Sequence, residues 1–547
     1  MRGAFVVQYR DMTLQRPTTS QSLAASAVLI GVLGIASRVL GLLRDRALAS
    51  AYGAGPVLDA YQAAFRIPDF AYNILGLAAL SAAFLPTFVR LRSSDRERAM
   101  AFASRVFSVV ACALAAVAAF GALAAGPLYR VLAPGFSPEQ LALTTALGRV
   151  LFPATFFLGC SAVVGGILQA EQRFLAFAAA PIAYNAGIIV GVLALAPAMG
   201  PVGIALGVLL GAAAHLMLQW IAASRVGFRF RITFAWGDAD VRATARRLLP
   251  RALALGASQV QLVVIAAIAT TLTAGTLAAF AFAVNIQSVP IALVGVAFAL
   301  AAFPRLAGAA AAGDGAAFQR HFSAAFRQVA LLAFPATVGL LTLKAQGVRV
   351  LLGAGAFDWD DTVRTLDALE AFGYGLPFAM FIPLLTRSFY AFEDTRTPFI
   401  VSILADVIGI AVAWVLGHTL GARGLAFAIA AASAFQATVL LALLRARATE
   451  FDDRRILAAV GRFACAALAM GVVIQFVKPI VAAWTGTDTF VGIGLQGVLA
   501  AAVGLAAYFA VGILLRSEEI TALARAFHRR VLRAVALPFG GADEARG

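Results

Sequence analysis

The sequence predicts an all-α polytopic membrane protein with about fourteen transmembrane helices, arranged as two six-helix repeats related by a parallel pseudo-twofold axis, plus two C-terminal helices. Three observations predict this fold. Hydrophobic residues make up 62% of the 547 residues and charged residues only 13%, whereas about a quarter of the residues of a soluble domain are charged. Long uncharged stretches recur along the chain. Finally, the two halves of the chain share short motifs at a nearly constant spacing.

Uncharged stretches locate the helices in order, because a span needs about 20 apolar residues. Two stretches are too long for one span: the first breaks at Pro197, Gly200 and Pro201, and the second turns at Thr273–Thr276. The first span follows a polar tail and lacks a convincing cleavage site, which predicts that it is not removed. Residues 345–365 are expected to form a loop. The stretches without Asp, Glu, Lys or Arg run over 21–37, 70–89, 106–129, 150–170, 174–223 and 252–304. Further apolar runs, some with isolated charged residues, cover about 322–343, 367–386, 398–418, 424–444, 457–483 and 489–515.

These spans group into an N-terminal lobe, a C-terminal lobe and a final pair of helices. The tail that ends the chain is basic, and we expect an amphipathic helix on the membrane surface over 517–535. The predicted segments are a cytoplasmic tail (1–20), an N-lobe of six spans (21–224), a cytoplasmic linker (225–244), a C-lobe of six spans (245–446), two further spans (457–515) and a basic cytoplasmic tail (516–547).

The basic residues predict the orientation in the membrane. The chain holds 43 Lys and Arg against 27 Asp and Glu, a net charge of +16. With both termini in the cytoplasm, 31 of the 43 fall in cytoplasmic segments, as the positive-inside rule requires. Topology therefore explains most of the charge, and no nucleic-acid partner needs to be invoked.

The repeat indicates transport. Asn185 falls on Asp406, and Gly203 falls on Gly424, at one and the same offset along the chain. Six spans per repeat is an even number, so both repeats have the same orientation. Parallel repeats of this kind are typical of transporters that bind substrate between the halves and work by alternating access. The alternative is a duplicated bundle that is merely stable.

Other classes of function have little support. The three cysteines, Cys112, Cys160 and Cys465, lie far apart in apolar stretches, so they predict neither a disulfide framework nor a metal site. The phosphate-binding motif of ATPases is absent from the sequence. The longest internal loop, about 224–251, holds mostly Arg rather than clustered carboxylates. We therefore expect no cofactor, no metal and no enzymatic activity.

Polar residues inside the predicted spans are the candidate site, because ionisable groups in a membrane are costly and mark pathways. Arginine offers a planar fork that fits phosphate oxygens, so the first two spans predict an anion-binding cavity. Structural ion pairs such as Arg44–Asp59 or Arg66–Asp69 are the alternative. The predicted substrate-binding residues are Arg38, Arg44, Asp45, Asp59, Gln62, Arg66 and Asn73 in the N-lobe, with the neutral Gln259 and Asn285 in the C-lobe.

Two further polar groups leave alternatives open. Asp406 lies inside a predicted span and fits either a coupling cation or a satisfied buried carboxyl. Residues 387–396, which include Arg387 and Asp394, fit a structural loop network.

Several motifs together resemble the MurJ/MviN lipid II flippase family of the multidrug/oligosaccharidyl-lipid/polysaccharide exporter superfamily. The resemblance covers nearly the whole chain. The motifs are SRVLGLLRD (37–45), YGAGPVLDAYQAAFRIPD (52–69), LSAAFLP (80–86), LAPGF (132–136), Arg149 before Phe152-Pro153, and SFYAFEDTRTP (388–398).

The resemblance implies a flippase of the bacterial inner membrane that moves lipid II, an undecaprenyl-diphosphate-linked muropeptide, to the outer leaflet for cell wall synthesis and cell shape. It implies that Arg38 and Arg44 line the cavity with Asp45 and Asp59, and that residues 457–515 hold the lipid tail. A coupling ion or the membrane potential would drive transport, with membrane lipids as further partners.

The chain departs from the family pattern at four positions. Tyr72, Leu77, Asn285 and Ser288 stand where the family often has charged residues. These departures leave room for an alternative, an exporter of another polyprenyl-linked oligosaccharide or of drugs from the same superfamily.

Overall fold

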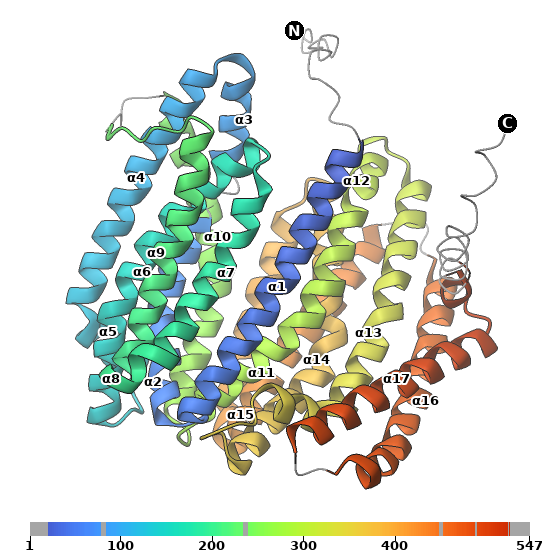
Figure 1. The fold of residues 1–547 in the computed structure, drawn as a ribbon. Coiled ribbons are helices and arrows are strands. Elements are labelled where there is room, and N and C mark those ends of the chain that lie inside the picture. The colour runs from blue at the N-terminus through green and yellow to red at the C-terminus, as the bar shows by residue number, and fades with distance from the viewer. Residues whose placement is uncertain are drawn as a thin grey trace, which may run out of the picture. The chain divides into compact units, whose positions relative to one another are not determined.

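The computed structural model describes residues 20–77, 84–233, 239–447, 452–486, 489–522 and 525. Within these ranges the chain is helical and contains no strand (Figure 1), so the predicted all-α class is confirmed. The elements are α1 (Ser20–Tyr52), α2 (Pro56–Ala71), η1 (Tyr72–Leu77), α3 (Leu85–Ser94), α4 (Arg96–Leu123), α5 (Ala125–Leu132), α6 (Pro138–Ala170), α7 (Phe174–Val190), η3 (Gly191–Leu195), α8 (Ala196–Met199), α9 (Val202–Arg225), α10 (Ala239–Thr270), α11 (Thr276–Pro290), η4 (Ile291–Val296), α12 (Ala297–Ala311), α13 (Gly315–Leu351), α14 (Trp359–Ala391), α15 (Arg396–Arg447), α16 (Asp453–Thr485) and α17 (Phe490–Leu514).

Ten helical segments of the described chain are long and apolar enough to cross a membrane, so the protein is a multi-pass membrane protein. One of them, α15, bends sharply at Gly421 and joins two helices across that bend. The number of fourteen spans stays a prediction. The expected amphipathic helix over 517–535 lies largely outside the described residues, as does the tail over 1–20 except for Ser20.

The expected loop over 345–365 is wrong for most of its length. Helix α13 continues to Leu351, and α14 begins at Trp359. The Asp358 side chain accepts a hydrogen bond from the backbone N–H of Asp361 at 2.8 Å, which caps the N-terminus of α14. Asp358 is therefore the N-terminal cap of α14, and Asp360 and Asp361 lie in its first turn, where acidic residues are favoured.

Backbone geometry repeats at the spacing seen in the sequence. Gln172 and Glu393, which are separated by the same offset as Asn185 and Asp406, both adopt left-handed conformations, with φ of 57° and 59°. In both turns the next residue donates its backbone N–H to a carbonyl five residues earlier, which is the Schellman pattern at a helix end. Gly200 and Gly421, again at this offset, have φ of 64° and 57°. The two repeats therefore share turns as well as motifs.

The chain forms two compact units. Unit 1 comprises Met1–Arg44, Ala71–Ala122 and Val150–Ala252; unit 2 comprises Asp45–Phe70, Leu123–Arg149 and Leu253–Gly547. Helices α1, α6 and α10 begin in one unit and end in the other. The predicted lobes, which follow the repeat, stay a prediction.

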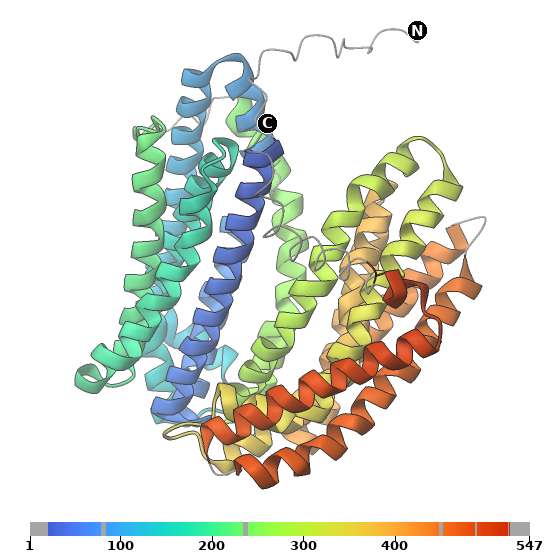
Figure 2. The same ribbon diagram turned by 45° about the vertical axis from the view of Figure 1, so that its right-hand side comes forward.

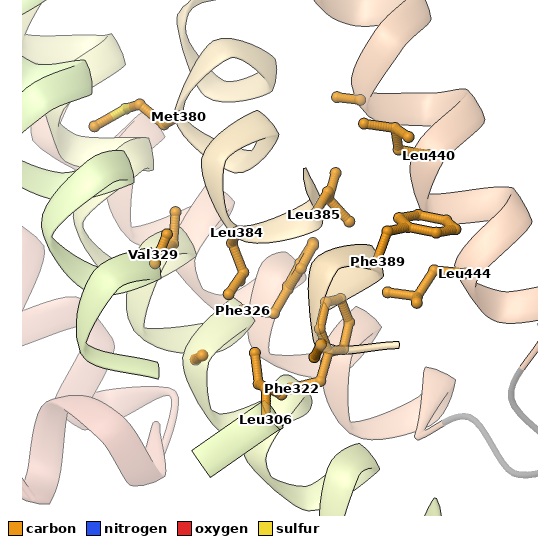
Figure 3. Close-up of a cluster of buried hydrophobic side chains, with 14 of the residues drawn as sticks. Leu306, Phe322, Phe326, Val329, Met380, Leu384, Leu385, Phe389, Leu440 and Leu444 are labelled. Carbon is orange, nitrogen blue, oxygen red and sulfur yellow. The ribbon is translucent and has the colours of Figure 1, made fainter. Parts of the chain in front are cut away.

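Each unit has its own apolar core. In unit 1, residues of α4, α6 and α9 pack together, and the rings of Phe107, Trp220, Phe228 and Phe230 hold the segment after α9 against α4. In unit 2, α12, α13, α14 and α15 meet in a cluster that includes Phe326 and Leu384 and is drawn in Figure 3. Burial of such side chains is the main source of stability between helices.

The last two helices, α16 and α17, pack side by side (Figure 2) and attach to α13 in unit 2. The Tyr508 hydroxyl donates to the Leu331 carbonyl at 2.7 Å, and Lys478 Nζ donates to the Thr342 carbonyl at 3.0 Å. Large apolar side chains such as Phe476 and Trp484 are left exposed on this pair. Exposed apolar surface of this kind suits contact with lipid.

Candidate functional site

Two of the predicted arginines, Arg38 and Arg44, lie on the part of α1 that belongs to unit 1. The Arg38 side chain is exposed, and it has no hydrogen-bond or ion-pair partner among the described residues. Arg44 is partly buried and donates from NH1 to the Asn185 Oδ1 at 3.1 Å. Both guanidinium groups can therefore supply N–H donors in unit 1, one of them held in place.

Asn185 is the residue that positions Arg44, and the sequence pointed to it only as an anchor of the repeat. Its side chain is buried in α7. Its Nδ2 donates to the Pro181 carbonyl at 3.0 Å and to the Ser37 carbonyl at 3.5 Å, which leaves Oδ1 as the acceptor for Arg44. Gly41 faces this amide, and a Cβ there would lie 4.0 Å from the Asn185 Oδ1, an ordinary van der Waals contact. The only sequence signal for this role was that Asn185 is a polar amide inside an apolar stretch.

Asp45 and Asn285 were predicted separately, and the structure brings them together in unit 2. The Asn285 Nδ2 donates to the Asp45 Oδ2 at 2.9 Å, and Asp45 is buried. A buried carboxylate needs such partners because its desolvation is costly. In this arrangement Asn285 joins α11 to the part of α1 in unit 2.

Asp59 caps the N-terminus of α11. Its two carboxylate oxygens accept from the backbone N–H groups of Gly275 at 2.5 Å and Ala278 at 2.8 Å. Gly275 is the N-cap residue and has φ of 86°, and no side chain of α11 itself caps this end. A negative side chain at a helix N-terminus satisfies free N–H groups and interacts well with the helix dipole. In this conformation Asp59 is committed to this contact.

A second carboxylate reinforces the same region. The Asp361 Oδ2 accepts from the Ala54 N–H at 2.8 Å, and its Oδ1 pairs with Arg364 at 3.0 Å. The Ser50 carbonyl accepts from the Ala356 N–H at 2.8 Å. We call these contacts, together with the Asp59 cap, the turn interface: they attach the α1–α2 turn to residues of the second repeat, all within unit 2. Asp361 was missed because 345–365 read as a loop.

The glycines of the turn interface make the close approach possible. A Cβ on Gly275 would overlap the Ala54 carbonyl oxygen, and one on Gly53 would lie 2.6 Å from Asp361 Oδ2. Both glycines have positive φ, which other residues adopt at a cost. Sequence alone marks these glycines as turn residues but does not reveal their partners.

The remaining predicted residues take no part in the hydrogen bonds described above. Arg66 of α2 is partly buried, and its Nε atom is buried without a hydrogen bond among the described residues. Gln62 and Gln259 are partly buried in unit 2, and Asn73 lies in η1 of unit 1. Of the nine predicted residues, Arg38, Arg44 and Asn73 therefore belong to unit 1, and the other six to unit 2.

The sequence did not settle how two polar positions inside the spans, Asp406 and Ser161, are accommodated. Asp406 is partly buried and has no hydrogen-bond partner among the described residues. Nearby, Gly409 faces Gln261, whose Nε2 lacks a hydrogen bond in the described part of the chain. In unit 1, the Ser161 hydroxyl bonds to His215 Nδ1 at 2.7 Å and to Gln219 Oε1 at 3.0 Å, which satisfies a polar group buried between α6 and α9.

The expected loop network at 387–396 is a cap with an ion pair. Asp394 accepts from the backbone N–H of Thr397 at 3.0 Å and from its hydroxyl at 2.8 Å, and it pairs with Arg447 at 2.8 Å. The backbone hydrogen bond from Thr397 is the first cause that lowers the Asp394 pKa, and the hydroxyl of Thr397 and Arg447 lower it further. The residue therefore fixes the start of α15.

Repeated helical spans, a pair of added helices and arginines on α1 are features of a multi-spanning transporter. The structure resembles that of a lipid II flippase MurJ in an inward closed conformation, with a TM-score of 0.72 and 24% identity over 88% of this chain and 99% of that chain. It also resembles a multidrug resistance MATE transporter of the MOP superfamily, with a TM-score of 0.65 and 18% identity over 77% of this chain and 98% of that one.

The sequence comparison is more specific than the fold. The family described as "Lipid II flippase MurJ" matches residues 48–494. A protein of Rhizobium tropici named "Probable lipid II flippase MurJ" is 29% identical over 93% of this chain and 97% of its own length. The chain belongs to the lipid II flippase MurJ family, and it is a multi-pass protein of the inner membrane.

Proposed function

We propose that this protein moves lipid II from the inner to the outer leaflet of the cytoplasmic membrane by alternating access, for cell wall synthesis. The family match over residues 48–494 carries the proposal. The arginines on α1 support it, because a lipid-linked diphosphate needs cationic donors at membrane depth. As in the rest of its family, transport rather than catalysis is the activity.

Arg38 and Arg44 are the proposed contacts of the diphosphate. A guanidinium presents paired N–H donors to phosphate oxygens and keeps its charge in a low-dielectric environment. Asn185 accepts from Arg44 NH1, so the orientation of that guanidinium is set before substrate binds. Arg66, whose buried Nε lacks a partner among the described residues, is a further proposed contact, with Gln62, Asn73 and Gln259 as neutral donors or acceptors.

The turn interface has a different role in this proposal. Asp59, Asp361 and the glycines that face them hold the end of α1 against the second repeat. With both termini in the cytoplasm, as the basic residues predict, this end faces outward. Its contacts would hold the outer side closed and would have to break before the headgroup is released outside.

The energy source is proposed to be ionic. The membrane potential supplies about 2.3 kcal/mol per charge per 100 mV, so the return of an empty cationic site could be driven by it. Asp406 is the proposed position for a coupling cation, because its carboxyl has no hydrogen-bond partner in the described chain. The pair α16–α17, with exposed residues such as Phe476, would accommodate the polyprenyl tail.

Complementation tests the proposal. Cells depleted of their own flippase receive this protein, its Arg38→Ala variant or the control Arg231→Ala, which removes an exposed arginine from the segment after α9. We expect wild type and the control to sustain growth and the Arg38 variant to fail at equal expression. Growth with Arg38→Ala would contradict the proposed role of the arginine, and failure of wild type would contradict the flippase function.

Another lipid-linked oligosaccharide is the remaining candidate substrate, since Asn285 and Ser288 replace charged residues common in the family. Vesicles that contain the protein and either lipid II or an O-antigen-type lipid separate the two. The likeness to the multidrug transporter concerns the fold alone, and a cationic site disfavours cationic drugs.

A further inference from the structure

A mostly apolar groove lies at one end of unit 1, where α1, α7 and α9 come together. Its volume is about 760 Å³, and its walls include Leu29 of α1, Leu175 of α7, and Leu218 and Ile221 of α9. Leu29, Leu175 and Ile221 are themselves exposed. A groove of this size can accept part of a lipid-sized molecule. Its walls are the surface that an acyl chain would contact.

The mouth of this groove is basic. Arg173 and Arg225 line the apolar groove and also a second, polar pocket of about 580 Å³ that continues from it. This second pocket contains Arg96 and Glu171 as well, so three arginines face one glutamate. The apolar groove and the basic pocket thus form one continuous site with an apolar part and a cationic part.

The glutamate is already neutralised. Glu171 accepts from Arg92 Nε at 2.7 Å and from Arg92 NH2 at 3.2 Å, and it lies 3.6 Å from Arg96. Arg173 and Arg225 have neither an ion pair nor a hydrogen bond from their side chains within the described residues. Among the described residues, the mouth therefore carries more positive charge than carboxylates balance, which favours an anion.

The repeat shows what is missing at this mouth. Asp394 lies just before α15 and caps it by accepting from the backbone N–H of Thr397. The residue equivalent to Asp394 by the offset of the repeat is Arg173, the N-cap residue of α7, and its side chain makes no cap hydrogen bond. A helix N-terminus attracts negative charge. Thus, beside the groove, the first repeat has a cation where the second repeat has a capping anion.

We propose that this groove binds an anionic phospholipid, with one acyl chain against Leu175, Leu218 and Ile221 and the phosphate between Arg173 and Arg225. Charge complementarity selects this occupant: the apolar walls require a chain, and the unbalanced arginines require an anionic head. The orientation predicted from the basic residues puts this end at the cytoplasmic leaflet, whose surface is rich in anionic lipid. The site is separate from Arg38 and Arg44, and it does not depend on the flippase function.

Native mass spectrometry of the full chain in neutral detergent tests the proposal, with phosphatidylglycerol and phosphatidylcholine of identical acyl chains as probes. We expect preferential retention of phosphatidylglycerol. Each of Arg173→Gln and Arg225→Gln should weaken that retention roughly fivefold, because a basic residue near a lipid surface contributes about 1 kcal/mol. The control Arg231→Gln removes the same charge from an exposed position outside the groove and should leave retention unchanged.

A second variant tests the apolar part. Ala179→Trp fills the groove from α7 and should reduce retention of phosphatidylglycerol while the arginines remain. The proposal would be overturned if both lipids were retained equally, or if Arg231→Gln lost as much retention of phosphatidylglycerol as the groove variants. It would also be overturned if inorganic phosphate alone abolished the retention of phosphatidylglycerol. Retention of lipid II in place of phosphatidylglycerol would also overturn it. Complementation by the wild-type chain is read separately, so failure of this proposal and failure of the flippase function give different results.

Discussion

At the scale of single residues, the site depends on how each polar side chain is held. Arg44 is oriented by Asn185, and Asp59 is committed to the N-terminus of α11. The sequence predicted Arg44 and Asp59 because charged residues are rare in membrane helices. It did not predict their partners, since Asn185 is a neutral residue of another helix and the Gly275 donor is a backbone N–H without a sequence pattern. Contacts made across helices are decided by packing.

Removal of the Asn185 amide tests whether this residue positions Arg44. Asn185→Ala deletes an acceptor of Arg44, and a hydrogen bond to a charged group contributes about 1.5–3 kcal/mol. We expect lipid II transfer in vesicles to fall roughly tenfold or more with little change in folding. The control Ser402→Ala removes an exposed side-chain hydrogen bond within α15. Transfer equal to that of the control would show that Arg44 needs no positioning by Asn185.

The carboxylate of Asp59 can be weakened without a change of size. Asp59→Asn keeps one acceptor oxygen and loses the charge, which should cost the turn interface about 1 kcal/mol. In a variant without native cysteines, a cysteine at Ser50→Cys reports opening through its rate of reaction with a thiol reagent. We expect a roughly fivefold faster reaction. Asp314→Asn, which weakens the cap of α13, serves as control, and an equal change in both would contradict the assignment.

At the scale of helices and turns, close backbone approaches decide which conformation is held. Gly275 and Gly200 share a positive φ, but only Gly275 faces another part of the chain: a Cβ there would meet the Ala54 carbonyl oxygen, whereas one on Gly200 would meet open space. A substitution at Gly200 therefore adds backbone strain alone, whereas one at Gly275 adds both backbone strain and a steric clash. It also explains why sequence could place both turns but not distinguish their roles.

Gly275→Ala and Gly200→Ala form a matched pair. Both should lower thermal stability, because a non-glycine residue at positive φ costs about 1 kcal/mol. Only Gly275→Ala should open the turn interface, seen as a more than tenfold faster reaction of the cysteine at Ser50→Cys. Equal reaction rates in the two variants would show that the α1–α2 turn does not rely on close packing.

The cap at the start of α15 predicts a pH dependence. Because the Asp394 pKa is lowered, first by the Thr397 backbone hydrogen bond, its contribution is present above the ordinary value of about 3.9 and is lost as pH falls through the lowered value. Asp394→Ala should therefore reduce the melting temperature at pH 7, and the difference from wild type should shrink as pH falls below the ordinary value and through the lowered pKa. A difference that stays constant with pH would contradict this contribution.

At the scale of the whole molecule, the internal repeat and the distribution of charged residues along the chain predict the arrangement of the helices. The close contact of Gly203 with Leu195 recurs between Gly424 and Leu416, the equivalent pair of the second repeat. Periodic motifs and uncharged stretches therefore predicted the repeat, the helical class and the breaks near Pro201 and Thr273. They misplaced the loop at 345–365, because Asp358 and its neighbours belong to a helix start rather than a loop.

Transfer of lipid II between leaflets is the measurement that tests the central claim most directly. Vesicles that contain the purified protein and fluorescent lipid II are treated with an impermeant enzyme that cleaves the exposed headgroup. We predict that wild type and Arg231→Ala make nearly all the lipid accessible, and that Arg38→Ala leaves only the fraction found in empty vesicles. Wild-type protein that gives no more accessible lipid II than empty vesicles would contradict the account.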